Sequence, residues 1–410
     1  MKKNIKGFIL SCVILISPFL YSAEKGKTLS PDVVKANFNA DISNVNLDFL
    51  NQTITPEVLE SKAQADFSQI PDFAFSYLNN LVVNAINASV SSFDGVMYSI
   101  NMKDVPDALI AARDRGVKVR LIIDENHVYP RMDTQIKRLI NAGPGIEVRT
   151  LKGYQDYGRT HNKITIHDGE LVTVGSYNWT FSATFSNYEN ILVARNPMYV
   201  EPYKKYFEWM WSNSRTIAQG QSPQSVQVGA YGLPPQDNNP PMSLNGVSVP
   251  AYLFSPGSDT ENRIAALIDA CKVSVDAVTF SFSSKPIADA LVRAYKRGIK
   301  VRFLEDSDMA KKASLAQYVY KSGVPFKIIG GRNDKGAMHN KFIIYDGKLL
   351  STGSFNFATN ASVNSFENVI FVSDTNAIKA YQNKFDWFYS QATVPSDSYF
   401  NPDNPVPSEN

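Results

Sequence analysis

The sequence predicts an α/β protein of two homologous lobes, each a mixed, largely parallel β-sheet flanked by helices. One observation is an internal repeat, in which DALIAARDRGVKVR (107–120) and DALVRAYKRGIKVR (289–302) are identical at 9 of 14 positions. A second is the pair HNKITIHDGELVTVGSYN (161–178) and HNKFIIYDGKLLSTGSFN (339–356), identical at 10 of 18 positions. The offsets, 182 and 178 residues, differ by one four-residue loop, so the pattern indicates a duplicated unit.

The order of the expected elements is the same in each half. In the first half, an apolar helical stretch (77–88) precedes a strand (95–100), a second helix that ends at Gly116, and a buried strand (117–124). The second half repeats these elements at 263–271, at 274–282, in a helix that ends at Gly298, and at 299–306. Such strand–helix–strand units predict parallel strands covered by helices. We expect the two lobes to pack with a shared active site at their interface.

The N-terminus predicts export. Three lysines precede an apolar run at 8–21, which is shorter than the roughly 20 residues of a bilayer-spanning helix, and Ala23 is a suitable cleavage position. We therefore expect a signal peptide and a periplasmic or secreted protein. The expected organisation is a signal peptide 1–23, an N-terminal extension 24–68, a first lobe 69–215, a proline-rich linker 216–250, a second lobe 251–394 and a mobile tail 395–410.

Charge and cysteine content narrow the class of protein. Without the leader the chain has 38 Lys and Arg against 39 Asp and Glu, a net charge of −1 with neutral His, so it has no general attraction for nucleic acid. A local basic track of Arg159, Arg332 and Lys335 stays possible. Cys12 falls in the leader, so the remaining Cys271 has no intramolecular disulfide partner and is expected in the core.

Strand periodicity separates the polar residues of the repeated segment into two groups. Residues two apart on a strand share a face, so His161 and Lys163 are presented together while Asp168 points the opposite way. Ser176 and Asn178 arrive from the next strand and turn. The second copy presents His339, Lys341, Ser354 and Asn356 in the same way, with Asp346 on the opposite face. The two aspartates are therefore expected to be structural and to tie down a neighbouring strand or turn.

These side chains suit a tetrahedral anion. A neutral imidazole is a nucleophile or base, and an ammonium and an amide donate hydrogen bonds to oxyanions. If the lobes face each other, one histidine attacks phosphorus while the other protonates the leaving oxygen. The lysines then offset phosphate charge where a metal ion would otherwise do so. Since the sequence has neither HExxH nor CxxC, no metal and no cofactor are expected.

Four further polar residues are candidates for roles at the site. Glu189 and Glu367, each 28 residues after its histidine, could each hold an imidazole in the required tautomer. His127 and His167 have no histidine at the matching position of the other half, and a structural or substrate-adjacent role is expected for them. A duplicated folding core would explain the repeat without catalysis, but polar residues of these types are poor ones to keep in register for folding alone.

The whole pattern resembles a known family. HxK, four residues, Asp, six residues and GSxN form the HKD signature of the phospholipase D superfamily, and both copies match it in full. The resemblance spans residues 70 to 392 and implies a two-lobe α/β sandwich, with a phosphohistidine intermediate that requires no metal. The roles that it implies are His161 as nucleophile, His339 as acid and base, Lys163, Lys341, Asn178 and Asn356 as phosphate ligands with Ser176 and Ser354 nearby, and Glu189 and Glu367 as orienting carboxylates.

The resemblance predicts the reaction more closely than the substrate, because the superfamily includes phospholipases, phosphatidyltransferases and nucleases. GSYNWT and SNYENILV in the first copy are similar to the branch of small endonucleases and mitochondrial lipid hydrolases. Export, low net charge, and Tyr154 and Tyr157 beside the site favour a phospholipase D that hydrolyses headgroup esters at a membrane surface. We expect a monomer without a stable protein partner. An exported metal-independent endonuclease acting on nucleic acid is the first alternative, and a phosphatidyltransferase is the second.

Overall fold

The computed structural model describes residues 64–401, apart from residues 219–220, 228 and 239. The expected signal peptide, almost all of the N-terminal extension, and residues 402–410 of the tail lie outside the described residues.

The first lobe is built on an eight-stranded sheet in the order β1-β7-β6-β5-β2-β3-β4-β8. Its strands are β1 (Phe73–Ala74), β2 (Ser92–Met97), β3 (Lys118–Asp124), β4 (Ile146–Leu151), β5 (Lys163–His167), β6 (Leu171–Gly175), β7 (Ile191–Ala194) and β8 (Arg215–Thr216). Its helices are α4 (Leu78–Ala88), α5 (Asp104–Asp114), η2 (Glu125–His127), α6 (Thr134–Ile140), α7 (Phe181–Phe185) and α8 (Pro197–Asn213). Strands β2, β3 and β4 run parallel, and the other ladders are antiparallel, so the sheet is mixed.

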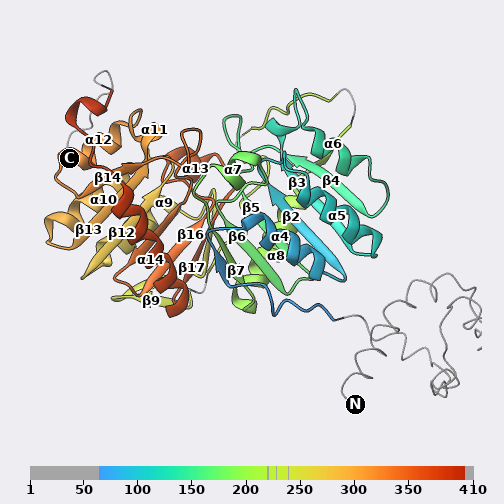
Figure 1. The fold of residues 1–410 in the computed structure, drawn as a ribbon, viewed down its shortest axis with the longest axis horizontal. Helices are drawn as coiled ribbons and strands as arrows, with labels where there is room; N and C mark the ends of the chain where they lie inside the picture. The colour runs from blue at the N-terminus through green and yellow to red at the C-terminus, as the bar shows by residue number, and fades with distance from the viewer. Residues whose placement is uncertain (1–63, 219–220, 228, 239, 402–410) are drawn as a thin grey trace, which may run out of the picture. The chain divides into compact units, whose positions relative to one another are not determined.

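The second lobe repeats this arrangement in a seven-stranded sheet, β11-β17-β16-β15-β12-β13-β14. Its strands are β11 (Tyr252–Ser255), β12 (Ser274–Thr279), β13 (Lys300–Asp306), β14 (Phe326–Ile329), β15 (Phe342–Tyr345), β16 (Leu349–Gly353) and β17 (Glu367–Val372). Its helices are α9 (Thr260–Ala270), α10 (Lys285–Lys296), α11 (Ser307–Ala310), α12 (Ser314–Lys321), α13 (Thr359–Val363), α14 (Thr375–Gln391) and η3 (Asp397–Tyr399). Figure 1 shows the two lobes beside each other, with β6 and β7 of the first facing β16 and β17 of the second.

Three layers of buried apolar side chains account for this architecture. Helices α4, α5 and α6 cover one face of the first sheet, and α9, α10 and α12 cover one face of the second. The third cluster joins the inner faces of both sheets with α8 and α14. Burying the Val- and Ile-rich inner strands on both faces explains why they are nearly continuous apolar runs.

Helices α8 and α14 connect the lobes directly. Each begins at an equivalent capping residue, where the side chain of Asn196 accepts from Met198 N and that of Asp374 accepts from Ala377 N. From α8, the Tyr199 hydroxyl donates to the Phe371 carbonyl of the second lobe at 2.9 Å. Because such hydroxyls are buried, their cross-lobe partners fix how the two lobes meet.

The motif aspartates lie in the turns after β5 and β15. Asp168, at φ 52°, accepts hydrogen bonds from the backbone N–H groups of Val90, Ser91 and Ser92 at 2.7–2.9 Å. Asp346, also at φ 52°, accepts from the N–H groups of residues 272, 273 and 274 at 2.8–3.1 Å. Each carboxylate therefore holds the start of the adjacent strand, β2 or β12, in register with the motif strand.

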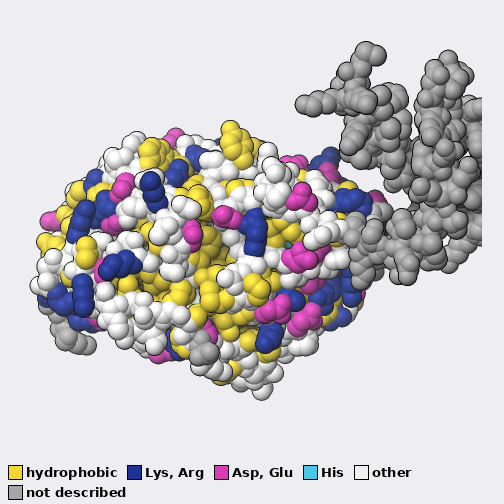
Figure 2. Space-filling view, turned by 90° about the horizontal axis from the view of Figure 1, so that it is seen from below, with side chains coloured by type: hydrophobic (Ala, Val, Ile, Leu, Met, Phe, Trp, Pro, Cys, Tyr) yellow, Lys and Arg dark blue, Asp and Glu magenta, His cyan; other side chains and the backbone are white. Residues whose placement is uncertain are grey.

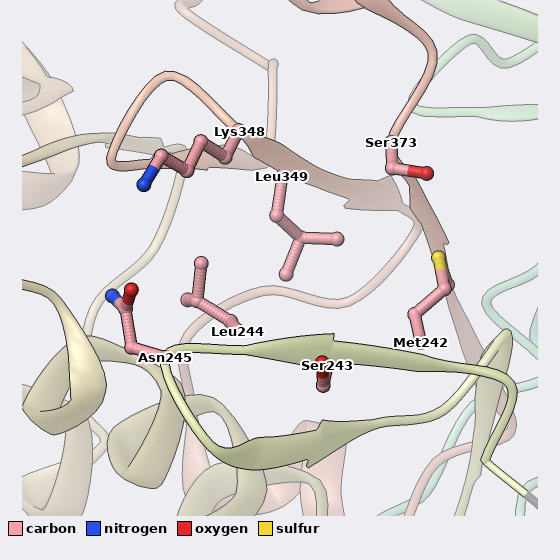
Figure 3. A pocket seen from close by; sticks show the side chains of 7 residues that line it. All are labelled: Met242, Ser243, Leu244, Asn245, Lys348, Leu349 and Ser373. Atoms are coloured by element: carbon pink, nitrogen blue, oxygen red, sulfur yellow. The ribbon is translucent and has the colours of Figure 1, made fainter.

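The segment between the lobes, expected as a linker over 216–250, contains a hairpin of β9 (Met242–Leu244) and β10 (Val247–Val249). Asn245 and Gly246 form its turn with positive φ angles of 50° and 97°, which an Asn-Gly pair tolerates well. The Asn245 amide donates to Asp346 Oδ2 at 2.6 Å, so the hairpin is attached to the second lobe. Figure 3 shows the cavity of about 360 Å³ beside it, lined by Met242, Ser243, Leu244, Asn245, Lys348, Leu349 and Ser373.

Figure 2 shows the side of the molecule that is seen from below relative to Figure 1. Basic and acidic side chains are intermixed over this face, and hydrophobic side chains gather near its middle. An intermixed surface of this kind agrees with the near-neutral charge of the sequence.

Candidate active site at the lobe interface

The two motif histidines lie where the lobes meet. Each precedes its strand, β5 or β15, and its backbone pairs with the opposite lobe. His161 N donates to the Phe366 carbonyl and His339 N donates to the Tyr188 carbonyl, both at 3.0 Å. Isolated parallel bridges at the preceding residues extend this pairing. The backbone on either side of each histidine is therefore positioned by both lobes.

Each imidazole is paired with a carboxylate of the other lobe. His161 Nδ1 lies 2.9 Å from Glu367 Oε1, and His339 Nδ1 lies 2.8 Å from Glu189 Oε2. A carboxylate acceptor at Nδ1 assigns the proton to that nitrogen and leaves Nε2 as the free lone pair. The two crossed His–Glu pairs are thus equivalent in geometry, and neither lobe contains a complete pair. Their charges differ, because burial raises the pKa of Glu367 to about 8, whereas at Glu189 the effect of burial is outweighed by His339 and the pKa is lowered.

Ser176 and Ser354 are placed differently from the expectation. Both are fully buried, and the Ser176 hydroxyl donates to Glu189 Oε2 while accepting from Asn190 N. The Ser354 hydroxyl contacts Glu367 and accepts from Asn368 N at 3.1 Å. Each hydroxyl therefore contacts a glutamate of a His–Glu pair. We expected these hydroxyls near the phosphate, whereas in the structure they support the glutamates.

The motif lysines are buried beside the imidazoles. Lys163 Nζ donates to the His161 carbonyl and Lys341 Nζ donates to the His339 carbonyl, both at 2.5 Å. Burial lowers the pKa of Lys163 to about 8 and that of Lys341 to about 7. An ammonium has three donors, so each lysine retains donors for an anion, whose charge would in turn raise these pKa values.

Burial also lowers the pKa of both histidines. At His161 the nearby charges of Lys163 and Lys341 lower the pKa further, and it falls well below its usual value. At His339 the Glu189 carboxylate offsets part of the effect of burial. The side chains are 13% and 10% exposed, respectively, so both rings are largely buried. A neutral imidazole at His161 suits nucleophilic attack, while the Glu189 carboxylate favours the protonated form of His339 that a general acid needs.

The asparagines of the motif complete the site. The Oδ1 atoms of Asn178 and Asn356 are buried and have no hydrogen-bond partner within the described residues. An amide oxygen accepts hydrogen bonds and does not bind an oxyanion, so the Nδ2 groups of these two side chains are the donors that an anion can use. Together the structure brings the two imidazoles and two ammoniums of the motifs to one place, and the two asparagines follow the strands next to them, β6 and β16.

Two pairs of positioning residues were not singled out from the sequence. The Asp124 carboxylate accepts from Thr160 N at 2.7 Å, and Asp306 accepts from Met338 N at 2.9 Å, so each fixes the residue before a motif histidine. Across the interface, the amides of Asn368 and Asn190 donate to Asn162 and Asn340, respectively, at 2.7 and 2.8 Å. The repeat could have identified these aspartates and asparagines, because each occurs at the matching position of both copies.

Two of the remaining candidate residues are buried away from the motif residues, and the others lie near His161 or on the loops before β5 and β15. His167 and Cys271 are buried away from the motif residues, His167 among Ser89, Phe67 and Phe93, and Cys271 at the end of α9. His127 lies edge-on to Tyr98, which in turn packs edge-on against His161. Tyr154 packs across the interface on Phe366, and Tyr157 is 82% exposed. Arg159 lies on the loop before β5, while Arg332 and Lys335 lie on the equivalent loop before β15.

The described residues lack two features that would indicate other types of site. They contain no group of three or more His, Cys, Asp or Glu side chains arranged to hold a metal ion. None of their helices combines the length and apolar character needed to cross a bilayer. Of the motif residues, Lys341 and Gly353 border a small void next to α9.

Comparison with known proteins identifies the family. The family described as "Cardiolipin synthase, PLD-like domain" matches residues 82–211 and again residues 264–389, which are the two lobes. This chain belongs to the phospholipase D superfamily. The paired match also explains why each lobe of this superfamily member has the same strand order.

Several relatives are similar to parts of this phospholipase D-superfamily chain. The mitochondrial cardiolipin hydrolase of Mus musculus is 31% identical over 173 residues, which are 42% of this chain and 72% of that protein. A phospholipase D of Rickettsia prowazekii is 32% identical over 141 residues, 34% of this chain and 66% of that protein.

A solved structure extends the likeness to both lobes. The phosphatidylserine synthase of Haemophilus influenzae matches 79% of this chain and 87% of its own, with a TM-score of 0.60 and 12% sequence identity. At this identity the likeness concerns the fold of the superfamily alone. Homologues of the superfamily support a hydrolase acting on phosphodiesters.

Proposed function

We propose that this protein is a phospholipase D-type enzyme that hydrolyses the headgroup phosphodiester of phospholipids. The crossed pairs His161–Glu367 and His339–Glu189 carry the proposal, because they present two equivalent imidazole Nε2 atoms to one buried, cationic site. Two imidazoles on opposite sides of a phosphorus atom suit in-line displacement with a covalent intermediate.

In the first step, Nε2 of His161 attacks phosphorus and forms a P–N bond while the P–O bond to the leaving alcohol breaks. His339 in its protonated form gives its Nε2 proton to the departing oxygen. The ammoniums of Lys163 and Lys341 and the amides of Asn178 and Asn356 hold the non-bridging oxygens, on which negative charge accumulates. Glu367 and Glu189 stabilise the imidazolium that develops on each ring in turn.

In the second step, His339 acts as base. It takes a proton from water, the water oxygen attacks phosphorus, and the P–N bond breaks to release neutral His161 and a phosphate monoester. The site is regenerated, since His339 is protonated again. The choice of His161 as nucleophile rests on the superfamily resemblance, because the geometry of the two pairs is equivalent.

A phospholipid substrate is supported by the side chains beside the site. Helices α7 and α13 directly follow the motif asparagines, and both lie where the lobes meet (Figure 1). They expose Phe181, Phe185 and Val363 at 65%, 52% and 45%, respectively. Large exposed apolar side chains on helices that follow the motif suit contact with acyl chains or the interfacial layer of a membrane better than contact with a nucleic acid backbone.

The test is an assay of the purified protein in millimolar EDTA. Phosphatidylcholine, phosphatidylglycerol and cardiolipin in mixed micelles are compared with plasmid and single-stranded DNA. We expect phosphatidic acid and a free headgroup from lipids, with turnover unchanged by EDTA because the lysines supply the positive charge. Efficient DNA cleavage without lipid cleavage would establish the endonuclease instead. Transfer of the phosphatidyl group to an added alcohol in preference to water would establish a phosphatidyltransferase.

We also propose that the protein is exported through the leader at residues 1–23, supported by its lysines and short apolar run. N-terminal sequencing of the protein recovered from periplasmic and culture fractions tests this. An N-terminus shortly after Ala23 is expected, and a full-length cytoplasmic protein would contradict it.

A further inference from the structure

The two crossed pairs match in their His–Glu distances, but the other contacts of the two glutamates differ. Glu189 binds His339 through Oε2, at 2.8 Å, and its Oε1 accepts a hydrogen bond from Nδ2 of Asn187 at 3.0 Å. Nδ1 of His161 lies almost equally far from both oxygens of Glu367, 2.9 Å from Oε1 and 3.0 Å from Oε2. Of these two glutamates, only Glu189 therefore has one oxygen bound to an amide and the other to its histidine within the described residues.

Asn187 and Ser365 occupy matching positions of the repeat, each two residues before the glutamate of its lobe. Both hold the backbone that leads to a motif histidine. Asn187 Oδ1 accepts from the N–H group of Ala337 at 3.1 Å, and Ser365 Oγ accepts from that of Arg159, also at 3.1 Å. The serine has one polar side-chain atom, and no hydrogen bond joins it to its glutamate in the part of the chain that the structure describes. The asparagine has a second polar group, an amide that donates to its glutamate, so Asn187 has a function that Ser365 lacks.

The amide of Asn187 favours the ionised form of Glu189, because a hydrogen-bond donor stabilises a carboxylate. Burial opposes ionisation of this carboxyl, but the charge of His339 and the hydrogen bonds from His339 and Asn187 contribute to outweighing burial, and the pKa of Glu189 is lowered. Burial raises the pKa of Glu367 to about 8. An ionised carboxylate stabilises a cationic imidazole, so His339 is better able than His161 to carry a proton.

The two roles of the histidines need opposite properties, because the general acid must carry a proton at Nε2 and the nucleophile must not. We propose that Asn187 is a positioning residue that assigns these roles. By holding Glu189 against His339, it makes His339 the acid and base and leaves His161 as the nucleophile. This role of Asn187 rests on the proposed function, and it adds a structural reason to an assignment that otherwise follows from the superfamily resemblance.

The first test removes the amide. Asn187→Ser installs the residue of the second lobe, which keeps an acceptor for the N–H group of Ala337 and loses the donor to Glu189. On the phospholipid that the parent hydrolyses best, the leaving alcohol needs a proton. There we expect kcat to fall about tenfold with KM unchanged, because a hydrogen bond to a charged group is lost. On bis(p-nitrophenyl) phosphate, whose leaving group needs no proton, the burst of nitrophenol should form at the parent rate.

Asn333→Ser is the matched control. This asparagine is exposed, and its amide donates at 3.2 Å to Oγ of Ser186, the residue before Asn187. The control should keep the parent values on both substrates. Equal losses of Asn187→Ser in lipid turnover and in the burst would assign Asn187 a purely structural role and overturn the proposal, as would the absence of any loss.

The fold of each variant is checked by its thermal transition. A misfolded Asn187→Ser is replaced by Asn187→Asp, which keeps the acceptor for Ala337 and places a carboxylate oxygen beside Glu189 instead of a donor. It should show the same difference between lipid and bis(p-nitrophenyl) phosphate, and equal losses on both would again overturn the proposal.

The second test moves the amide from one pair to the other in the double variant Asn187→Ser with Ser365→Asn. Bis(p-nitrophenyl) phosphate has two identical ester groups, so the substrate does not select which histidine attacks. After acid quench, the parent should carry phosphate on the HNKITIHDGE peptide, and the double variant should carry a measurable share on the MHNKFIIYDG peptide. Phosphate that stays wholly on His161 in the double variant, or that lies on His339 in the parent, would overturn the proposal.

Failure of the parent to hydrolyse any phospholipid would overturn the proposed function, and a thymidine dinucleotide then replaces the lipid in the comparison of kcat. The assays with bis(p-nitrophenyl) phosphate still decide the role of Asn187 in that case. A parent that forms no phosphohistidine on either peptide would overturn the proposed function and the inference together.

Discussion

The two lobes have the same strand order but differ in how they treat polar groups. Each lobe retains the polar residues of the candidate site. These are a histidine, a lysine, an asparagine, and a glutamate that pairs with the histidine of the other lobe. At other positions, each lobe has polar residues that the other lobe lacks. The first has Tyr98 and Arg159 beside its histidine, whereas the second buries Glu305 in its outer core, where the first has Ile123.

This comparison teaches that crossing the His–Glu pairs makes both copies indispensable. A duplicated site whose halves were each complete would tolerate loss of one half. Here each half lacks the partner that orients its own imidazole, so both motifs must be intact for either histidine to work. Residues outside the crossed pairs carry no such constraint, which is why the differences between the lobes occur there.

Removal of either histidine should have the largest effect. His161→Ala and His339→Ala should each lose roughly 10³-fold or more in kcat on phospholipid, because covalent and acid–base catalysis act as a unit. A p-nitrophenyl phosphodiester separates the two, since its leaving group needs no proton. His339→Ala should give a burst of nitrophenol and then stall, and His161→Ala should give no burst.

Acid quench and peptide mass spectrometry locate the phosphohistidine. Phosphate on the peptide around HNKITIHDGE supports the assignment. Phosphate on the peptide around MHNKFIIYDG would mean that the roles of the two lobes are reversed.

The crossed pairs give the next largest effect. Glu367→Gln should impair His161 and suppress the burst, and Glu189→Gln should impair His339 and resemble its alanine variant. The loss in each should be on the order of 10²–10⁴-fold, as expected when the carboxylate of a carboxylate–His pair is neutralised. Glu170→Gln, an exposed change in the turn after β5, is the control. If Glu189→Gln abolishes the burst and Glu367→Gln preserves it, each histidine is served by its own lobe.

The lysines should set the alkaline limit of activity. An ammonium is charged below its pKa, so lysines with pKa values of about 7 and about 8 lose their charge, and their hold on phosphate, as the pH rises through that range. We expect kcat/KM to fall on the alkaline side with an apparent pKa between these values, and on the acid side below the ordinary pKa of histidine. Lys341→Arg keeps its charge and should move the alkaline limb to higher pH. An unchanged limb in that variant would exclude Lys341 as its origin.

Glu305 should give the smallest effect, and it concerns stability. Its carboxylate oxygens are buried without a hydrogen-bond partner in the described residues, and burial raises its pKa well above the usual value. The folded state therefore binds a proton that the unfolded state releases, and stability decreases as the pH rises above the unfolded value. Glu305→Ile, which installs the residue of the first lobe, should raise the free energy of unfolding by about 1–3 kcal/mol.

Urea unfolding at pH 6 and pH 9 measures this effect, with a larger gain for Glu305→Ile at pH 9. The reciprocal change, Ile123→Glu, should destabilise the first lobe. Equal stability of Glu305→Ile and the parent at both pH values would show that Glu305 has a partner in solution.

Much of the site could be predicted from the sequence, because strand periodicity fixes which motif residues share a face. The mixed sheet, the lobe interface and the bonding of Asp168 and Asp346 to neighbouring backbone follow from that reasoning. The crossing of the His–Glu pairs could not be predicted, since Glu189 and Glu367 have the same spacing from their histidines whether they serve their own lobe or the other. Sequence spacing also could not show that the hydroxyls of Ser176 and Ser354 contact the glutamates. The direction in which the chain leaves Gly175 and Gly353 depends on tertiary packing.

The crossed pairs also have a consequence for the order in which the protein is made. A ribosome completes the first lobe, with His161 and Lys163, long before it reaches Glu367 in the last part of the chain. During that interval the first histidine has no carboxylate to hold its tautomer, and the second histidine does not yet exist. Both crossed His–Glu pairs are therefore complete only when nearly the whole chain has been translated and folded.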